Sequence, residues 1–188
     1  QVFASIYQYD SDGYQDELQQ FDPIRGAGAN FVSNADGITN TGFEIELYYA
    51  ATDRLTLSGN FSYTETEYGE DYFVFTVDDP INPVPVFGTF TQGFVSAQVT
   101  DPSQASDYTV NLKGGPLKGI PEEKATIRVS YEQDTRFGPL YYLLSHSYTG
   151  DFSASGIQRP LDRIDSRETT NLNISWYSQD GNLSLRAY

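Results

Sequence analysis

The sequence contains no cysteine and no methionine, and its only histidine is His146. The absence of cysteine excludes a disulfide framework, a thiol nucleophile and a cysteine-ligated metal site. A zinc site or a serine triad would need unusual partners around a lone histidine, so we interpret His146 as a structural wall residue and expect neither metal nor cofactor. No apolar run approaches the roughly 18 residues that a membrane-spanning helix requires.

Basic residues are scarce, and the chain is strongly acidic. It has 11 Lys and Arg residues against 26 Asp and Glu residues, which gives a net charge of -15 at pH 7. Because this charge would repel phosphates, we exclude nucleic acid as a partner and favour cations or cationic solutes. The 188 residues begin with Gln1, and the last residue interrupts an alternating segment, so we expect a piece of a longer protein.

Residues 40–68 alternate apolar and polar side chains with a period of two, interrupted by one short connection. Phe43 and Ile45 point to one face, and Glu44 and Glu46 point to the other, because successive side chains of a strand alternate between faces. The same pattern resumes after the connection. We therefore predict a long two-stranded antiparallel ribbon with one apolar face and one polar face.

Five further segments have the composition and alternation of strands. They are residues 2–9, 124–132, 140–149, 170–177 and the residues from 183 onwards. The facing of the first and the third of these segments stays open, because both of their alternating sets of side chains are mixed. Together with the ribbon, they predict seven antiparallel strands.

The connections between the predicted strands alternate between long and short. The long connections are at about 10–39, 69–119 and 150–168. Gly, Pro and Asn residues punctuate the first, which predicts an irregular loop, whereas 72–77 and 89–99 in the second could form strands of their own. Outer-membrane barrels collect long loops on the outside and short turns on the periplasmic side. This order favours a transmembrane barrel over a soluble sandwich, in which long loops occur at either end.

Aromatic residues make up 15% of the chain, with 15 Tyr and 12 Phe. On the apolar face of the predicted strands, some of them form two belts. The belts are Tyr49, Tyr131 and Trp176 near the short turns, and Phe43 and Tyr63 near the long loops. Such belts are typical of the two membrane–water interfaces. An extracellular β-sandwich or carbohydrate-binding module explains the composition nearly as well, so a secreted β-rich binding or adhesion module is the alternative.

Several short motifs occur in an order and spacing that characterise one family. They are NADG at 34–37 with TGFEIEL at 41–47, GPLKGIPE at 115–122, YTG at 148–150 and DGNLSLRAY at 180–188. This ordered set resembles the TonB-dependent outer-membrane receptors, in which NAG precedes GVELE and a later strand follows GxPLxGxPxH. Two features depart from the family. Pro121 is followed by Glu122, Glu123 and Lys124, whereas the family commonly has a His or Lys soon after the proline, and the final residues lack the terminal signature.

The resemblance implies an all-β fold, namely an antiparallel up-and-down transmembrane β-barrel of about 22 strands. The chain would supply about seven of them, approximately strands 15 to 21, as a fragment of one barrel domain. Since an isolated piece would leave open edges in lipid, the remaining strands of the same protein would complete it. The resemblance also implies an N-terminal plug domain and a TonB box, neither of which is present in this sequence.

The function implied by the resemblance is uptake of a scarce solute, such as a siderophore–iron complex, cobalamin or a saccharide. Outer loops would recognise the solute, and the plug would gate its passage. The implied location is the outer membrane of a Gram-negative bacterium, with outer-membrane lipid, the solute, the plug and TonB as partners. Since these residues contain no plausible nucleophile constellation, we do not expect an enzyme.

Glu44 and Glu46 lie two residues apart on the polar face of the predicted ribbon. A catalytic pair of carboxyl groups would need a pocket and two different pKa values. Because a barrel interior is polar, we interpret both residues as lumen-lining charges. Arg128 and Arg186 would line the lumen as well and could pair with them from other strands.

The outer loop 68–108 combines aromatic and acidic side chains and is the strongest ligand candidate. Its rings could stack on a flat or sugar-like solute, and its carboxylates could attract a cationic group. The candidate ligand-binding residues are Tyr68, Asp71, Tyr72, Phe73, Phe75, Phe87 and Phe90. The alternative is that the aromatic side chains bury one another while the acids keep the surface soluble.

An oxygen-rich cluster precedes the predicted ribbon. Asp10, Asp12, Asp16 and Glu17 resemble part of a calcium loop but depart from the EF-hand pattern. We therefore interpret this cluster as an acidic, solvated loop and expect no metal site there.

Overall fold

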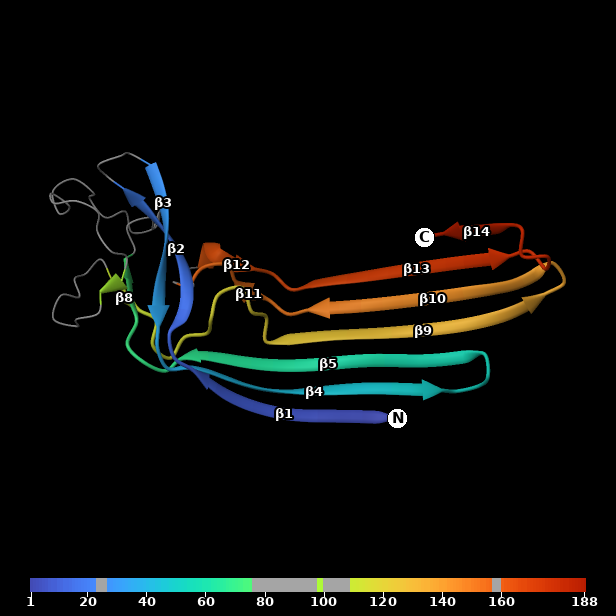
Figure 1. Ribbon diagram of the computed structural model, residues 1–188, viewed down its shortest axis with the longest axis horizontal. Coiled ribbons are helices and arrows are strands. Elements are labelled where there is room, and N and C mark those ends of the chain that lie inside the picture. The colour runs from blue at the N-terminus through green and yellow to red at the C-terminus, as the bar shows by residue number, and fades with distance from the viewer. Residues whose placement is uncertain (23–26, 76–97, 100–108, 157–159) are drawn as a thin grey trace.

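The computed structural model describes residues 1–22, 27–75, 98–99, 109–156 and 160–188. Its main element is one antiparallel sheet of seven strands in the order β1-β4-β5-β9-β10-β13-β14 (Figure 1). These strands are β1 (Val2–Ser11), β4 (Ile38–Ala50), β5 (Leu55–Tyr68), β9 (Glu123–Thr135), β10 (Gly138–Thr149), β13 (Arg167–Tyr177) and β14 (Ser184–Ala187). The seven predicted strands are therefore confirmed. Among the described residues, no helix has the length and apolar character needed to cross a membrane.

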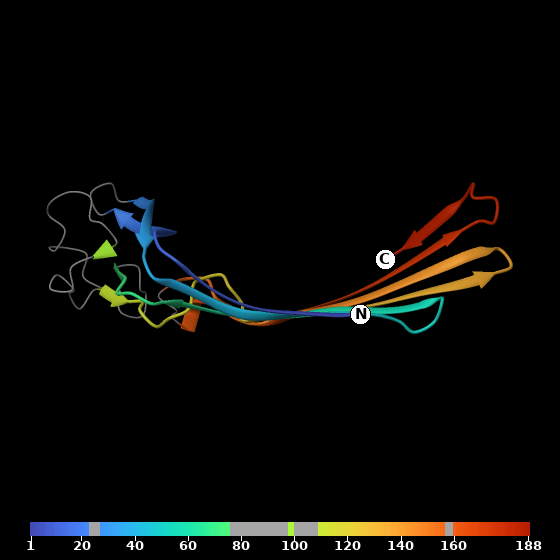
Figure 2. The ribbon, with the colours of Figure 1, turned by 60° about the horizontal axis from the view of Figure 1, so that its bottom comes forward.

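The main sheet is open and curved (Figure 2), with β1 and β14 as its two edges. Strands β4, β5 and β9 contain 13, 14 and 13 residues. A tilted strand needs only about 9 to 11 residues to cross a bilayer, so these strands can span it and extend beyond. An open sheet of such strands fits a segment of a larger barrel, because closure is what removes sheet edges from lipid.

The register settles the facing of β1, which the sequence pattern leaves open. Val2 lies opposite Leu47, and Ile6 lies opposite Phe43. Directly opposed residues of an antiparallel pair point to the same side of the sheet. Val2 and Ile6 therefore join the apolar face, whereas Tyr7 points to the polar face.

The register also settles the facing of β10. Tyr142 lies opposite Tyr131, and His146 lies opposite Ile127, so both belong to the apolar face. The Nδ1 atom of His146 is 2.8 Å from the hydroxyl oxygen of Thr170 on the neighbouring strand β13. The structure thus places the single histidine in the wall of the sheet.

The first long connection is not an irregular loop. It contains an antiparallel hairpin of β2 (Tyr14–Asp22) and β3 (Ala27–Ala35), which stands across the ends of β1 and β4 in Figure 1. The prediction of a loop is wrong because turn-forming residues do not prevent pairing once cross-strand hydrogen bonds satisfy the backbone.

The base of this hairpin is held by a reciprocal pair of hydrogen bonds. The backbone N–H of Gly13 donates to Asp36 Oδ1 at 2.7 Å, and that of Gly37 donates to Asp12 Oδ1 at 3.2 Å. Both glycines have a positive φ, 68° and 65°, which glycine adopts without a steric penalty. The two crossing bonds fix the direction in which the hairpin leaves the main sheet.

The described residues of the second long connection form three short strands, paired in the order β7-β6-β8. They are β6 (Phe73–Phe75), β7 (Gln98–Val99) and β8 (Thr109–Asn111). The strands predicted within 72–77 and 89–99 are confirmed for β6 and β7, and most of the remainder of those stretches lies outside the described residues. The third long connection contains β11 (Phe152–Ser153) paired with β12 (Arg163–Ile164), and the short 3-10 helix η2 (Pro160–Asp162).

Candidate functional site

The buried apolar side chains of the described residues gather beyond the long-loop end of the main sheet. This outer cluster consists of Ala35, Ile38, Tyr68, Tyr72, Leu112 and Leu117. They come from the hairpin, from the ends of β4 and β5, and from the residues on either side of β6 and β8. The cluster therefore ties the separate outer loops into one unit.

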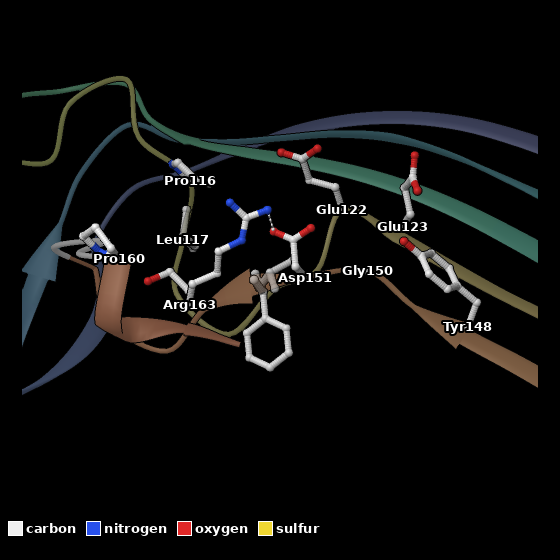
Figure 3. Close-up of a pocket in the computed structure, with 12 residues that line it drawn as sticks. Pro116, Leu117, Glu122, Glu123, Tyr148, Gly150, Asp151, Pro160 and Arg163 are labelled. Atoms are coloured by element: carbon white, nitrogen blue, oxygen red, sulfur yellow. Dashed lines mark ion pairs between the residues drawn. The ribbon is translucent and has the colours of Figure 1, made fainter. Parts of the chain in front are cut away.

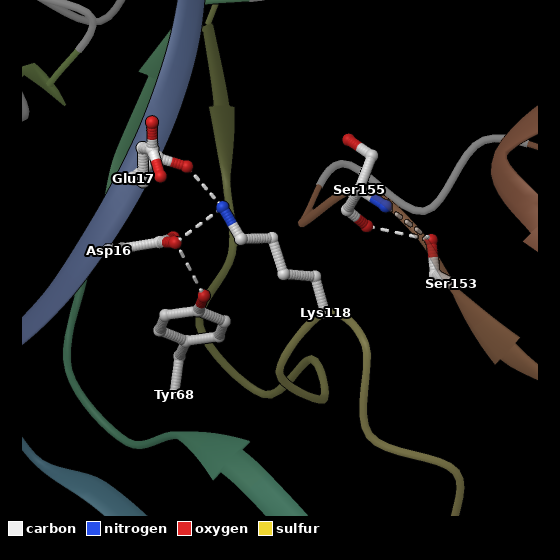
Figure 4. A network of polar contacts seen from close by, with 6 residues as sticks. All are labelled: Asp16, Glu17, Tyr68, Lys118, Ser153 and Ser155. Carbon is white, nitrogen blue, oxygen red and sulfur yellow. Dashed lines mark hydrogen bonds and ion pairs between the residues drawn. The ribbon is translucent and has the colours of Figure 1, made fainter. Parts of the chain in front are cut away.

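A buried carboxylate connects the hairpin to this cluster. Asp16 on β2 is 1% exposed, and the ammonium of Lys118 lies 2.7 Å from its Oδ1 (Figure 4). The Tyr68 hydroxyl donates to Asp16 Oδ2 at 3.2 Å, and Lys118 also donates to the backbone carbonyl of Glu17. The Asp16 carboxylate thus links the hairpin to the end of β5 through a hydrogen bond and to the segment that leads into β9 through an ion pair.

The carboxylates of the oxygen-rich cluster near the hairpin have partners within the protein. The carboxylate of Asp16 is paired with Lys118, that of Asp12 accepts the Gly37 N–H, and that of Asp10 accepts the Thr39 hydroxyl. In the part of the chain that the structure describes, no group of three or more His, Cys, Asp or Glu side chains could hold a metal ion.

Tyr68 and Tyr72 stack on one another, with ring centroids 5.5 Å apart and an interplanar angle of 11°. Their side chains are 1% and 2% exposed, so a solute cannot reach the ring faces in this arrangement. Burial, with a smaller contribution from the Asp16 carboxylate, raises the pKa of Tyr72 to about 12. This arrangement argues against direct stacking of a ligand on these two tyrosines. It agrees with the alternative interpretation of the loop, in which the aromatic side chains bury one another.

Of the other candidate ligand residues of this loop, the structure describes the side chain of Asp71 but not those of the four phenylalanines. Asp71 is exposed, accepts a hydrogen bond from Asn111 Nδ2 at 3.0 Å and lies 3.5 Å from Lys113 Nζ. The hydrogen bond from Asn111 lowers the pKa of Asp71, and the nearby ammonium of Lys113 lowers it further by a smaller amount. Phe73 and Phe75 lie on β6, but their side chains, like the whole of Phe87 and Phe90, fall outside the described residues. A ligand role for these four aromatic residues stays a prediction.

A pocket of about 700 Å³ lies at the outer rim of the wall, between residues 116–123 on one side and residues 148–153 with Pro160 and Arg163 on the other (Figure 3). We call it the rim pocket. Its lining includes Glu122, Glu123 and an ion pair in which Arg163 Nη2 is 2.7 Å from Asp151 Oδ2. The sequence does not reveal this pocket, because its two walls are about 30 residues apart in the chain. Only the glycine and proline residues within 115–122 hint at a bend there.

The four predicted lumen residues share the polar face of the main sheet. Glu44 lies opposite Ser62, Arg128 lies opposite Ser58, and Arg186 lies opposite Ser175. Glu46 borders a hollow of about 480 Å³ that Arg128 also lines. Among the described residues, no ion pair joins either glutamate to either arginine, so the pairing predicted between these strands does not form.

Comparison with known families identifies the chain. A family model described as TonB dependent receptor-like, beta-barrel, matches residues 1–188. The chain belongs to this family. A search of curated proteins finds no match.

Solved structures that share the fold of this TonB-dependent receptor chain include two receptors. The ferric yersiniabactin uptake receptor FyuA from Yersinia pestis gives a TM-score of 0.53 at 17% identity, over 80% of this chain and 18% of that chain. The siderophore receptor PiuA from Acinetobacter baumannii gives a TM-score of 0.56 at 14% identity, over 93% of this chain and 19% of that chain. The chain therefore spans less than a fifth of the length of these two receptors.

The family match confirms the predicted fold class and its location in the outer membrane of a Gram-negative bacterium. The apolar face of the main sheet consequently faces lipid. The long connections with the outer cluster lie at one end of the wall, and the short turns lie at the other.

Proposed function

We propose that the protein to which this chain belongs takes up a scarce solute across the outer membrane. Its outer loops bind the solute, and a plug domain that TonB moves releases it through the barrel lumen. The observation that carries this proposal is the family match over the whole chain. The convergence of the long loops on the outer cluster supports it, because recognition loops must be positioned by a rigid scaffold. The wall supplies enclosure, and no covalent step is involved.

A ferric siderophore is the first solute class to test, with cobalamin and saccharides next. FyuA is a ferric yersiniabactin uptake receptor, and PiuA is a siderophore receptor. In this chain, Asp71 and the four phenylalanines of the same loop are the proposed contacts. The buried pair Tyr68 and Tyr72 positions this loop instead of touching the solute.

The lumen face is the proposed contact surface for the plug. Glu46 and Arg128 border the same hollow, and within the described part of the chain neither has an ion-pair partner. Plug side chains of opposite charge would complete both groups at a low cost in desolvation, because a barrel lumen is polar. Glu44 and Arg186 would extend this surface along the same face.

The proposal is tested by deleting the gene for the full-length protein and measuring growth on ferric siderophores under iron limitation. We expect growth to fail on at least one siderophore and to be restored by the wild-type gene only in a strain with functional TonB. Restoration without TonB would contradict the gating step. If the full-length protein fractionates with soluble extracellular material and needs no detergent, the secreted binding or adhesion module becomes the better description.

A further inference from the structure

We infer that the rim pocket is a binding site for an amphiphilic organic cation, a molecule with an apolar body and a primary amine or guanidinium group. The inference goes beyond the proposed uptake function. It does not depend on that function, because binding at the rim requires neither a plug nor TonB.

The rim pocket has the size and the fixed walls of a small-molecule site. Its volume of about 700 Å³ falls within the range of about 300 to 1,000 Å³ that is usual for such sites. One wall is held by the Leu117 N–H, which donates to Thr66 Oγ1 at 3.0 Å. The two walls are joined where the Gly119 N–H donates to the Ser153 carbonyl and the Gly150 N–H donates to the Glu123 carbonyl, each at 2.8 Å. A ligand would therefore meet a preformed pocket.

One end of the pocket is apolar. Figure 3 shows Pro116, Leu117 and Pro160 grouped there, and the half-buried ring of Phe152 also lines the pocket. Leu117 is itself anchored in the outer cluster, so this end cannot collapse without disturbing the core of the loops. Burial of an alkyl or aromatic group against these side chains favours binding, because it removes apolar surface from water.

The opposite end is acidic and aromatic. Glu122, Glu123 and Tyr148 gather there in Figure 3. Neither glutamate has an ion-pair partner within the described part of the chain, whereas the third acid of the lining, Asp151, is neutralised by Arg163 at 2.7 Å. Two uncompensated carboxylates favour a cation and repel an anion, and the Tyr148 ring can add a cation–π contact.

The charge pattern favours an organic cation over a metal ion. These carboxylates do not belong to any metal-holding group of three or more side chains among the described residues. An amine with several N–H donors can satisfy two separated carboxylates and place its apolar body toward Leu117 at the other end. Glu123 lies opposite Tyr63, and Tyr148 lies opposite Ala125, so both belong to the lipid-facing side of the wall. The amine can therefore come from a soluble amphiphile or from a lipid headgroup.

The test uses the full-length protein, purified in an amine-free detergent, and 1-naphthylmethylamine as the probe at pH 7. We expect saturable binding by calorimetry and much weaker binding of 1-naphthalenemethanol, which has the same apolar body without the charge. The double variant Glu122→Gln/Glu123→Gln should weaken amine binding by about tenfold or more. The matched control Glu65→Gln/Glu67→Gln removes the same charge from exposed glutamates of the same rim and should leave binding within about twofold. Heat-modified gel mobility verifies that each variant is folded.

Three results would overturn the inference: no amine binding to the wild type, equal binding of the alcohol, or equal weakening in the two double variants. A second arm identifies the source of the amine. The probe is titrated into nanodiscs of phosphatidylglycerol with and without phosphatidylethanolamine. Weaker probe binding in the discs that contain phosphatidylethanolamine supports a lipid amine as the occupant, and unchanged binding supports a soluble one. Absence of binding in both kinds of disc contradicts the site.

Discussion

Apolar side chains are exposed on the membrane wall of this chain and buried at its outer end. In the wall, Ile6 is 88% exposed and Leu47 is 47% exposed, yet both belong to the apolar face of the main sheet. At the outer end, the apolar side chains are buried together with the Asp16 carboxylate, which pairs with the partly exposed ammonium group of Lys118. The difference follows from the solvent. Lipid accepts apolar side chains without burial, whereas loops in water must build a small core of their own.

The largest effect should follow from breaking the ion pair between Lys118 and the buried Asp16 at the outer end. Lys118→Met leaves Asp16 buried without its cation and should destabilise the hairpin by about 3 to 5 kcal/mol, because an isolated buried charge is costly. Amide hydrogen exchange of β2 and β3 in the full-length protein measures this loss. The double variant Asp16→Leu/Lys118→Met should recover most of it.

The exposed pair of the same region provides the control for that measurement. Lys113→Met removes the cation beside Asp71, which is exposed and keeps its hydrogen bond from Asn111, so exchange of the hairpin should not change. Equal effects of the Lys113 and Lys118 variants would show that the burial of Asp16 does not matter.

A smaller loss is expected from a charge on the lipid-facing side of the wall. Ile45→Arg places a guanidinium near the middle of β4 on the apolar face and should cost about 2 to 4 kcal/mol in the free energy of unfolding from lipid vesicles. Its neighbour Glu44 points to the lumen, so Glu44→Arg should change this free energy far less. If both variants lose the same stability, the assignment of the two faces is wrong.

Close packing on the lumen face should have the next smaller effect. A Cβ atom at Gly42 would meet the backbone oxygen of Tyr63 at 2.4 Å and the Tyr7 hydroxyl at 2.5 Å. Gly42→Ala should therefore cost about 1 to 3 kcal/mol in the same vesicle assay, as expected for overpacking. Gly59→Ala is the comparison, since its nearest neighbour would be the Thr126 oxygen at 3.1 Å, and it should cost less.

The smallest effect concerns pH at the outer cluster. Because burial raises the pKa of Tyr72 to about 12, its neutral form stabilises the cluster fully below the ordinary tyrosine value of about 10. This contribution should be lost as the pH rises from about 10 to about 12. The difference in absorbance at about 295 nm between the wild type and Tyr72→Phe should report that late titration. A difference that titrates near the ordinary value would contradict the burial of Tyr72.

The sequence by itself determined the seven strands and the two faces of most of them. A period of two is a local property, and lipid on one side and a polar lumen on the other impose it directly on residues such as Ile45 and Glu44. The alternation of long and short connections is local as well, and it sufficed to separate the outer end from the short-turn end. The ordered motifs then led to the correct family.

Only the tertiary structure decided the features that depend on residues far apart in the chain. The facing of β1 and β10 required the register with their neighbours, because both of their side-chain sets are mixed. The sequence marks Tyr68 as an aromatic residue beside acids. Its hydrogen bond to Asp16, which pairs with Lys118, brings together segments that lie about 50 residues before and after Tyr68 in the chain. The rim pocket also depends on residues far apart in the chain, because the cavity forms only where its two walls meet.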